Sequence, residues 1–231
     1  MRKKHFEEHS KTGALFKEFI LGGQDGLVNV LGVILGIAIA TLDIKLVIIA
    51  GLAAAFAESF SMAAVAYTSA KAEEDFYKSQ EEREKYEIET LPKQEAKEIY
   101  DIYYQKGFRG KLLDNIVNHI TKDKKRWLDI MMKEELGLTD TFVHPIKSAA
   151  IVGLAAIVGS IIPLLAFFFF PIKTAIYASL AISAIALFIT GAIEGKMTLG
   201  HWVKKGGQLV IIGLAAAGIG FLIGMILGAG A

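Results

Sequence analysis

The sequence predicts an all-α membrane protein with five transmembrane helices and one cytosolic insert of three helices. Three observations predict this fold class. Hydrophobic residues make up 53% of the 231 residues, and the mean hydropathy is +0.45. The charged residues are concentrated in one segment, since residues 71–147 hold 15 of the 25 basic and 17 of the 24 acidic residues. This pattern indicates a polar module between apolar segments that a bilayer solvates.

Five apolar stretches are each long enough to cross a hydrocarbon core of roughly 30 Å as a helix. Residues 43–45 alone separate the first two, and Pro171 lies between the third and fourth, so each pair is expected to form a tight hairpin. The expected spans are residues 19–42, 46–66, 148–170, 174–193 and 209 to the C-terminus. The predicted organisation is an N-terminal arm at 1–18, helices 1 and 2 at 19–69, an insert at 70–147, and helices 3 to 5 at 148–231.

Lysine and arginine predict the orientation of these helices, because basic residues gather on the cytosolic side of a membrane protein. The N-terminal arm holds five basic residues and the insert fifteen, and Lys196, Lys204 and Lys205 precede the last span. The other side holds Lys45 and Lys173. We therefore expect the N-terminus and the insert in the cytosol and the C-terminus outside. The membrane is expected to be the cell membrane in a prokaryote and a vacuolar-type membrane in a eukaryote.

Three polar residues, Asp25, Asn29 and Glu58, interrupt otherwise apolar spans, where carboxylates are costly and mark functional sites. Counting from the hairpin turn at about 1.5 Å per residue places Asp25 level with Met62, and Asn29 level with Glu58 one turn deeper. We interpret these four residues as a cation path, because carboxylate with thioether suits a borderline transition metal. In the alternative, Asp25 is interfacial, Met62 is packing, and a neutral Glu58 is hydrogen-bonded to Asn29.

Glycines recur at four-residue spacing on the first and last spans, and such ridges let helix backbones approach closely. Packing within one subunit and contact between two subunits both explain the spacing, and the sequence leaves the two open. The ridges are Gly22 with Gly26, Gly32 with Gly36, and Gly220 with Gly224 and Gly228.

The insert is expected to begin with a polar helix that continues the second span and ends at Leu91 and Pro92. The expected helices are residues 70–89, 93–105 and 112–136, with a break near 119–122 of the third as an open alternative.

Pairs of glutamates three residues apart lie on the first two helices of the insert, and residues at this spacing share a helix face. Two antiparallel helices therefore direct four carboxylates toward one site, as in the carboxylate-bridged metal sites of helix bundles. The alternative is a solvated acidic surface paired with lysine and arginine. The pairs are Glu84 with Glu87 and Glu95 with Glu98, and Met131, Met132, Glu134 and Glu135 end the third helix.

The sequence contains no cysteine, which excludes thiolate metal sites. The five histidines lack ligand spacing, and we do not assign them to metal. They are His5, His9, His119, His144 and His201.

Four short motifs occur along the chain in a fixed order. They are residues 23–28 (Gly-Gln-Asp-Gly-Leu-Val), Ser61-Met62, the glutamate-rich stalk with its Leu-Pro break, and Met131-Met132 with Glu135. This combination resembles the vacuolar iron transporter family over nearly the whole chain. The resemblance implies a five-helix homodimer that exports cytosolic ferrous iron, and often manganese, in exchange for protons, along a path between subunits.

The same resemblance implies that Asp25 and Met62 are the membrane ligands. The cytosolic metal site that it implies comprises Glu84, Glu87, Glu95, Glu98, Met131, Met132 and Glu135. One position departs from the family pattern, because Ala54 stands where members commonly carry a glutamate, and Glu58 follows one turn later on the same face. We hypothesise that Glu58 replaces this carboxylate.

We therefore expect a transporter rather than an enzyme, with no catalytic residue. Its expected path is Asp25, Asn29, Glu58 and Met62, and its expected partners are divalent transition-metal ions, protons, the lipid bilayer and a second copy of the chain, without nucleic acid. We expect no cofactor beyond the transported Fe(II) or Mn(II), with Zn(II) as an alternative ion at the cytosolic site. The alternatives are a membrane-tethered, ferritin-like iron storage or ferroxidase protein and a metal-gated channel.

Overall fold

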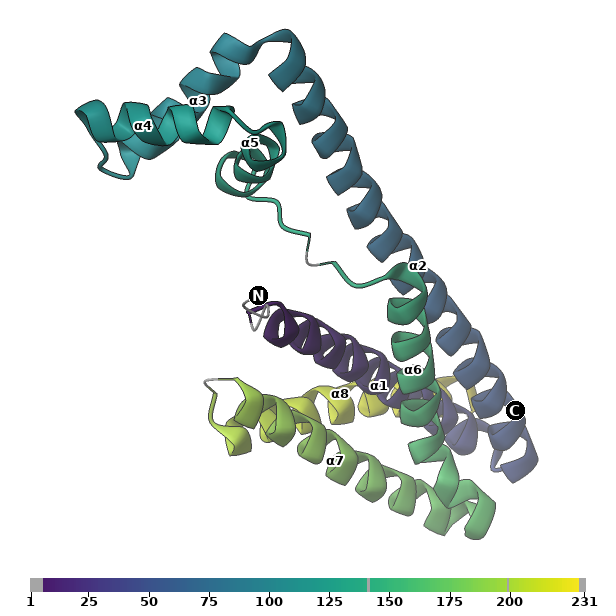
Figure 1. The fold of residues 1–231 in the computed structure, drawn as a ribbon. Coiled ribbons are helices and arrows are strands. Elements are labelled where there is room, and N and C mark those ends of the chain that lie inside the picture. The colour runs from purple at the N-terminus through teal and green to yellow at the C-terminus, as the bar shows by residue number, and fades with distance from the viewer. Residues whose placement is uncertain (1–5, 141, 199, 229–231) are drawn as a thin grey trace. The chain divides into compact units, whose positions relative to one another are not determined.

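The computed structural model describes residues 6–140, 142–198 and 200–228, and every regular element in these ranges is a helix. Residues 1–5 of the predicted arm, with His5, and residues 229–231 of the last predicted span lie outside the described residues. Five of the helices are long and apolar enough to cross a membrane, which confirms the prediction of an all-helical, multi-span protein. They are α1 (Phe6–Thr41), α2 (Ile44–Thr90), α6 (Pro145–Phe169), α7 (Ile172–Met197) and α8 (Trp202–Gly228), labelled in Figure 1.

The chain divides into two compact units, one of Met1–Thr68 with Val143–Ala231 and one of Ser69–Phe142. Helix α2 contributes to both units, because its apolar first half belongs to the first and its charged second half to the second. Its 47 residues extend about 70 Å, more than twice a bilayer core, so only part of it can span. The second unit also contains α3 (Pro92–Gln105), α4 (Gly110–Thr121), α5 (Lys124–Ile130) and a π-helical turn, η1 (Met131–Glu135).

Several helix boundaries differ from those predicted, and α8, for example, begins at Trp202 rather than at residue 209. Helix α1 begins at Phe6, so most of the arm expected before residue 19 is helical. The third helix expected in the insert is instead α4, α5 and η1, with a break at Lys122 and Asp123. The Asp123 side chain accepts hydrogen bonds from the backbone N–H groups of Lys125 (3.0 Å) and Arg126 (3.1 Å). This cap starts α5, and the break lies beside the region near residues 119–122 where the sequence had left one open as an alternative.

The first two spans are joined by a tight turn at Leu42 and Asp43. Leu42 adopts a left-handed conformation with φ of 51°, which reverses the chain within two residues. The Asp43 carboxylate then accepts a hydrogen bond from the Lys45 N–H at 2.8 Å, so it caps the first turn of α2. The predicted hairpin is therefore closed by a backbone reversal and a side-chain cap.

Helix α1 packs backbone to backbone against both α6 and α8 through its glycines. A Cβ atom at Gly26 would collide with the backbone carbonyl oxygen of Ala156 on α6, and one at Gly36 would lie 2.9 Å from the carbonyl oxygen of Gly220 on α8. Both contacts are too close for a real carbon atom. The glycine ridges thus pack against other helices of the same chain, which is the first of the two alternatives that the sequence left open.

The α8 ridge offers a direct test of this packing. A methyl group at Gly220 would meet the backbone of Gly32, whereas one at Gly218 would meet no atom within 4 Å. We predict that Gly220→Ala destabilises the protein by about 1–3 kcal/mol through overpacking. Gly218→Ala, the matched control on the same helix, leaves the melting temperature of detergent-solubilised protein unchanged. Equal melting temperatures for the two variants would contradict the close packing.

Candidate functional site

The strongest candidate site in the second unit is a cluster of three glutamates. Glu84 comes from the charged half of α2, Glu95 from the first turn of α3, and Glu135 from the end of η1. One carboxylate oxygen from each lies within 4.8 Å of the other two. Glu84 and Glu95 are each only 3% exposed, which is rare for carboxylates without a positive partner. The three oxygens are spaced so that one cation can contact all of them.

The electrostatics of the glutamate cluster favour binding of either protons or a cation by its carboxyl groups. Burial and the neighbouring carboxyls of Glu95 and Glu135 raise the pKa of Glu84 to about 8. Burial and the charges of Glu98 and Glu95 raise the pKa of Glu135 to about 7, and burial raises the pKa of Glu95 as well. These shifts follow because Glu84 and Glu95 are buried and the exposed Glu135 lies beside them, so that neighbouring negative charges disfavour the ionised forms.

Two carboxylate oxygens in the cluster, Glu84 Oε1 and Glu95 Oε2, are buried without a hydrogen-bond partner. A buried oxygen that accepts no hydrogen bond loses its hydration without replacement. A divalent cation would supply the missing interaction for both groups. The chemistry of an all-oxygen donor set suits ions such as Mn(II), Fe(II) and Mg(II).

The π-helical turn η1 positions the third carboxylate. Its wider winding appears as a hydrogen bond from Leu136 N–H to the Met131 carbonyl, five residues back (3.1 Å). Beyond the turn, Leu138 N–H donates to the Met132 carbonyl (2.8 Å). Such turns are rare and often occur at functional sites. Within the turn, Glu134 forms an ion pair with Lys106, whereas Glu135 joins the glutamate cluster. The two adjacent glutamates therefore have different environments.

The remaining predicted ligands of the insert lie around this cluster rather than inside it. The negative charges of Glu87 and Glu98 both raise the pKa of Glu135. Glu87 also forms a 3.0 Å ion pair with Arg83. Met131 and Met132 are buried, at 0% and 2% exposure. Met131 packs in a hydrophobic cluster with Ile88, Ile99, Ile120 and Trp127. Metal ligation by these four predicted residues stays a prediction.

A second polar group lies within the membrane-spanning unit. The Asn29 side-chain amide donates a hydrogen bond to the Glu58 carboxylate, so the predicted pairing of these two residues is confirmed. The Asp25 carboxyl group lies close enough to Glu58 to interact with it. Met62 is half-buried and lies one turn beyond Glu58 on α2. The contact fits both a cation path and a hydrogen-bonded neutral Glu58, so the transport role of these residues stays a prediction.

The neighbours of Glu58 on α2 have structural roles. Ser59 is buried and donates a hydrogen bond to the Ala55 carbonyl at 2.6 Å, so its hydroxyl is already occupied. Ala54 packs against the hydrophobic core of the membrane unit. Ala54 therefore serves packing here, and Glu58 is the acidic group on this part of α2.

Sequence reasoning overlooked Glu18, which it assigned to the N-terminal arm. The Ser148 hydroxyl on α6 donates a hydrogen bond to Glu18 at 2.7 Å, and the other carboxylate oxygen of Glu18 is buried without a partner. The available signal was spacing, because Glu18 precedes Asp25 by seven residues, or about two helical turns, and so lies near the same face of α1.

These features define a multi-pass, α-helical membrane protein with acidic residues inside its spans and a glutamate cluster in a separate helical unit. Within that class, the chain belongs to the VIT family, whose model matches residues 16–225. It is 35% identical over 217 residues to vacuolar iron transporter 1 of Tulipa gesneriana, covering 93% of this chain and 88% of the relative.

Two further relatives show the same extended similarity. Vacuolar iron transporter 1 of Arabidopsis thaliana is 33% identical over 221 residues, with 95% of this chain and 88% of the relative covered. The vacuolar iron transporter of Plasmodium falciparum is 32% identical over 235 residues, with 97% and 86% covered. The family resemblance seen in the motifs is thus confirmed over most of the chain.

The raised pKa values make metal binding by the glutamate cluster dependent on pH. At pH 6 Glu84 and Glu135, with pKa values of about 8 and 7, hold protons that a metal ion must displace, whereas by pH 8.5 both are mostly ionised. We therefore predict that Mn(II) affinity of the full-length protein, measured by titration calorimetry, rises with pH across this window. Glu135→Gln weakens binding and flattens the profile, whereas Glu134→Gln, the adjacent control, retains both. Affinity that is constant with pH would rule out the proposed competition.

Proposed function

We propose that this protein is a membrane transporter that moves divalent iron, and also manganese, out of the cytosol in exchange for protons. The observation that carries the proposal is the Asn29–Glu58 hydrogen bond with Asp25 beside it, inside helices that are otherwise apolar. Ionisable groups inside a membrane are costly and are typical of ion and proton pathways. Membership of the VIT family supports metal-ion transport as the activity.

The choice of ion rests on donor chemistry and on the named relatives. The relatives described above are named iron transporters. Carboxylate and amide oxygens from Asp25, Glu58 and Asn29, with the Met62 thioether nearby, form a mixed donor set suited to Fe(II) and Mn(II). Magnesium and calcium prefer oxygen ligands only, so the thioether disfavours them.

The direction of transport rests on the distribution of charge along the sequence. Basic residues are concentrated in the N-terminal region and in residues 71–147, which supports a cytosolic location for the glutamate cluster. In this proposal Glu84, Glu95 and Glu135 capture the ion from the cytosol. Asp25, Asn29, Glu58 and Met62 then carry it through the membrane.

Proton coupling follows from competition at one carboxylate. A carboxyl group that holds a proton cannot ligate a metal ion with the same oxygen, so binding of one releases the other. Protons that enter from the far side would displace the metal from Asp25 or Glu58. Return of the protonated groups to the cytosolic side would let them release their protons there and bind metal again, which completes the exchange.

A homodimer is part of this proposal. The Asn29 side chain is exposed on the surface of the single chain, beside a groove of about 500 Å³ between α1 and α8. A polar amide that faces lipid tails is unfavourable, and a second copy of the chain would cover it. This arrangement would place Asn29 and Glu58 near the subunit interface, where the resemblance puts the path.

A ferritin-like storage or ferroxidase protein is the main alternative. Di-iron sites of that class use a glutamate and histidine three residues apart on a helix. The glutamate cluster contains no histidine, and His119 contacts Arg126 instead. Consumption of oxygen by Fe(II)-loaded protein would favour the alternative. A metal-gated channel would show metal flux without any movement of protons.

The central activity can be measured in proteoliposomes loaded with a pH-sensitive dye. We predict that Fe(II) and Mn(II) enter with an opposite flow of protons, and that Asp25→Ala slows metal entry at least about tenfold because a ligand is lost. Glu89→Ala, which removes an exposed carboxylate paired with Lys124, serves as the control and transports normally. Uptake that is equal in the Asp25 variant and the wild type would remove Asp25 from the path.

The role of Glu58 in coupling can be tested separately. Glu58→Gln keeps a hydrogen-bonding partner for Asn29 but cannot exchange a proton. We predict that the metal-driven proton flux is lost in this variant. Glu194→Gln, which changes a carboxylate paired with Lys205 at 2.8 Å, is the matched control and keeps the flux. If metal-driven proton flux persists in Glu58→Gln, Glu58 does not replace the missing family carboxylate.

A further inference from the structure

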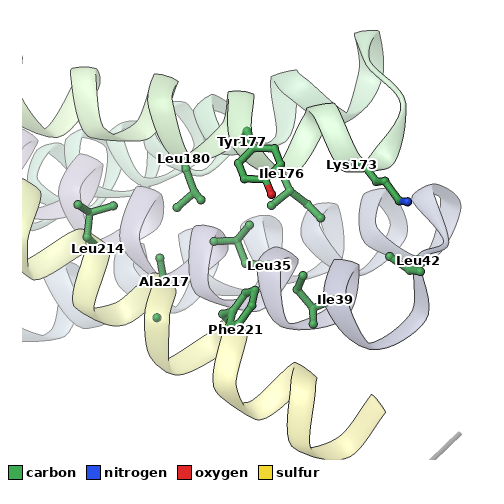
Figure 2. A pocket seen from close by; sticks show the side chains of 11 residues that line it. Leu35, Ile39, Leu42, Lys173, Ile176, Tyr177, Leu180, Leu214, Ala217 and Phe221 are labelled. Carbon is green, nitrogen blue, oxygen red and sulfur yellow. The ribbon is translucent and has the colours of Figure 1, made fainter. Parts of the chain in front are cut away.

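An apolar pocket of about 460 Å³ lies between α1, α7 and α8 in the membrane unit. Its walls are hydrocarbon side chains along most of its length, including Leu35, Ile39, Leu180 and Phe221. Figure 2 shows Leu214 at one end of the pocket and Lys173 and Leu42 at the other. The pocket is therefore lined mainly by apolar side chains and has the positively charged Lys173 at one end.

The charged end coincides with the turn between α6 and α7. Lys173 is exposed, and in the part of the chain that the structure describes it has no interacting partner. Helix α7 begins beside it after Pro171, and no side chain caps its first turn. The N–H groups of an uncapped first turn attract anions, as does the lysine ammonium group. The Tyr177 hydroxyl lies one turn further along the same wall.

The length of the pocket matches the upper part of a lipid tail. From Lys173 to Leu180 the wall runs seven residues, or about 10 Å along the helix axis. That distance is about a third of the hydrocarbon core, measured from the membrane interface inward. An amphiphile with an anionic head at the helix end and a hydrocarbon tail fits both the charge and the walls.

A second copy of this chain fits the charged end less well. It would need an acidic side chain near this end of the spans, where Asp43 lies, but the Asp43 carboxylate already caps α2 by accepting from Lys45 N–H. The exposed polar side chain Asn29 belongs to a different groove between α1 and α8. The pocket therefore favours a lipid over a protein partner.

We propose that this pocket binds one acyl chain of an anionic phospholipid, whose phosphate is held by Lys173 and the first turn of α7. The lipid belongs to the leaflet that contains the α6–α7 turn. Its tail packs against Leu35, Ile39 and Phe221. Binding to the folded protein stabilises it by mass action, and this effect does not depend on whether the protein transports metal.

The test compares lipids and variants of the full-length protein in a neutral detergent. Phosphatidylglycerol is expected to raise the melting temperature of the wild type, whereas phosphatidylcholine with the same tails raises it much less. Lys173→Gln is expected to weaken phosphatidylglycerol binding about fivefold, since one lysine is lost. Lys173→Arg is expected to keep the preference for phosphatidylglycerol over phosphatidylcholine. Lys45→Gln, which removes a basic residue outside the pocket, is expected to leave this preference unchanged.

Filling the pocket provides an independent check. Gly218 lines the pocket and has no atom within 4 Å of an added Cβ, so Gly218→Leu is expected to fill it and abolish the lipid effect. Gly207→Leu, a control on α8 with equal local space, keeps the effect. Equal stabilisation by both lipids, or an unchanged response in Lys173→Gln and Gly218→Leu, would overturn the proposal. A loss of dimer in Gly218→Leu would assign the pocket to a subunit contact, and stabilisation by glycerol phosphate alone would assign it to a free anion.

Discussion

The membrane unit depends on close backbone packing of α1 between α6 and α8. Glycines at Gly26 and Gly36 let these helices touch where any side chain would collide. Such contact fixes the register of α1 far more tightly than packing of flexible side chains would. The tight turn at Leu42 and Asp43 then sets the depth of α2 relative to α1, and this brings Asn29 level with Glu58, to which its amide donates a hydrogen bond.

The two acidic groups share one physical property, since each holds carboxylates where water is scarce. In the membrane unit, Asn29 compensates part of the cost for Glu58. In the second unit, Glu84 and Glu95 retain buried oxygens without partners, and burial raises the pKa of both groups, which favours their protonated forms when no cation is bound. A group that needs either a proton or a cation is suited to exchange one for the other. This common property links both groups to the proposed antiport.

Much of this structure could be predicted from the sequence. Hydropathy identified five spans, because satisfying backbone groups in lipid requires long apolar helices. Depth counting from a tight turn paired Asn29 with Glu58, since helical rise is constant. Local chemistry decided what the sequence pattern had left open or did not show. The Asp123 cap fixes the break that the sequence offered only as an alternative, and a π-helical turn separates the environments of Glu134 and Glu135. Neither the cap nor the π-helical turn changes the spacing of hydrophobic residues, so the sequence pattern does not reveal them. The spacing of the glycines also does not show which helix each ridge packs against, because that depends on tertiary packing.

The central claim is that this protein binds a transition-metal ion both at the glutamate cluster and within its spans. Anomalous diffraction from crystals of the full-length protein grown with Mn(II) tests this claim most directly, because the signal locates the ion itself. The account predicts one peak among Glu84, Glu95 and Glu135 and a second beside Asp25 and Glu58. Peaks confined to exposed surface carboxylates such as Glu73 and Glu89, with none at either predicted position, would contradict it.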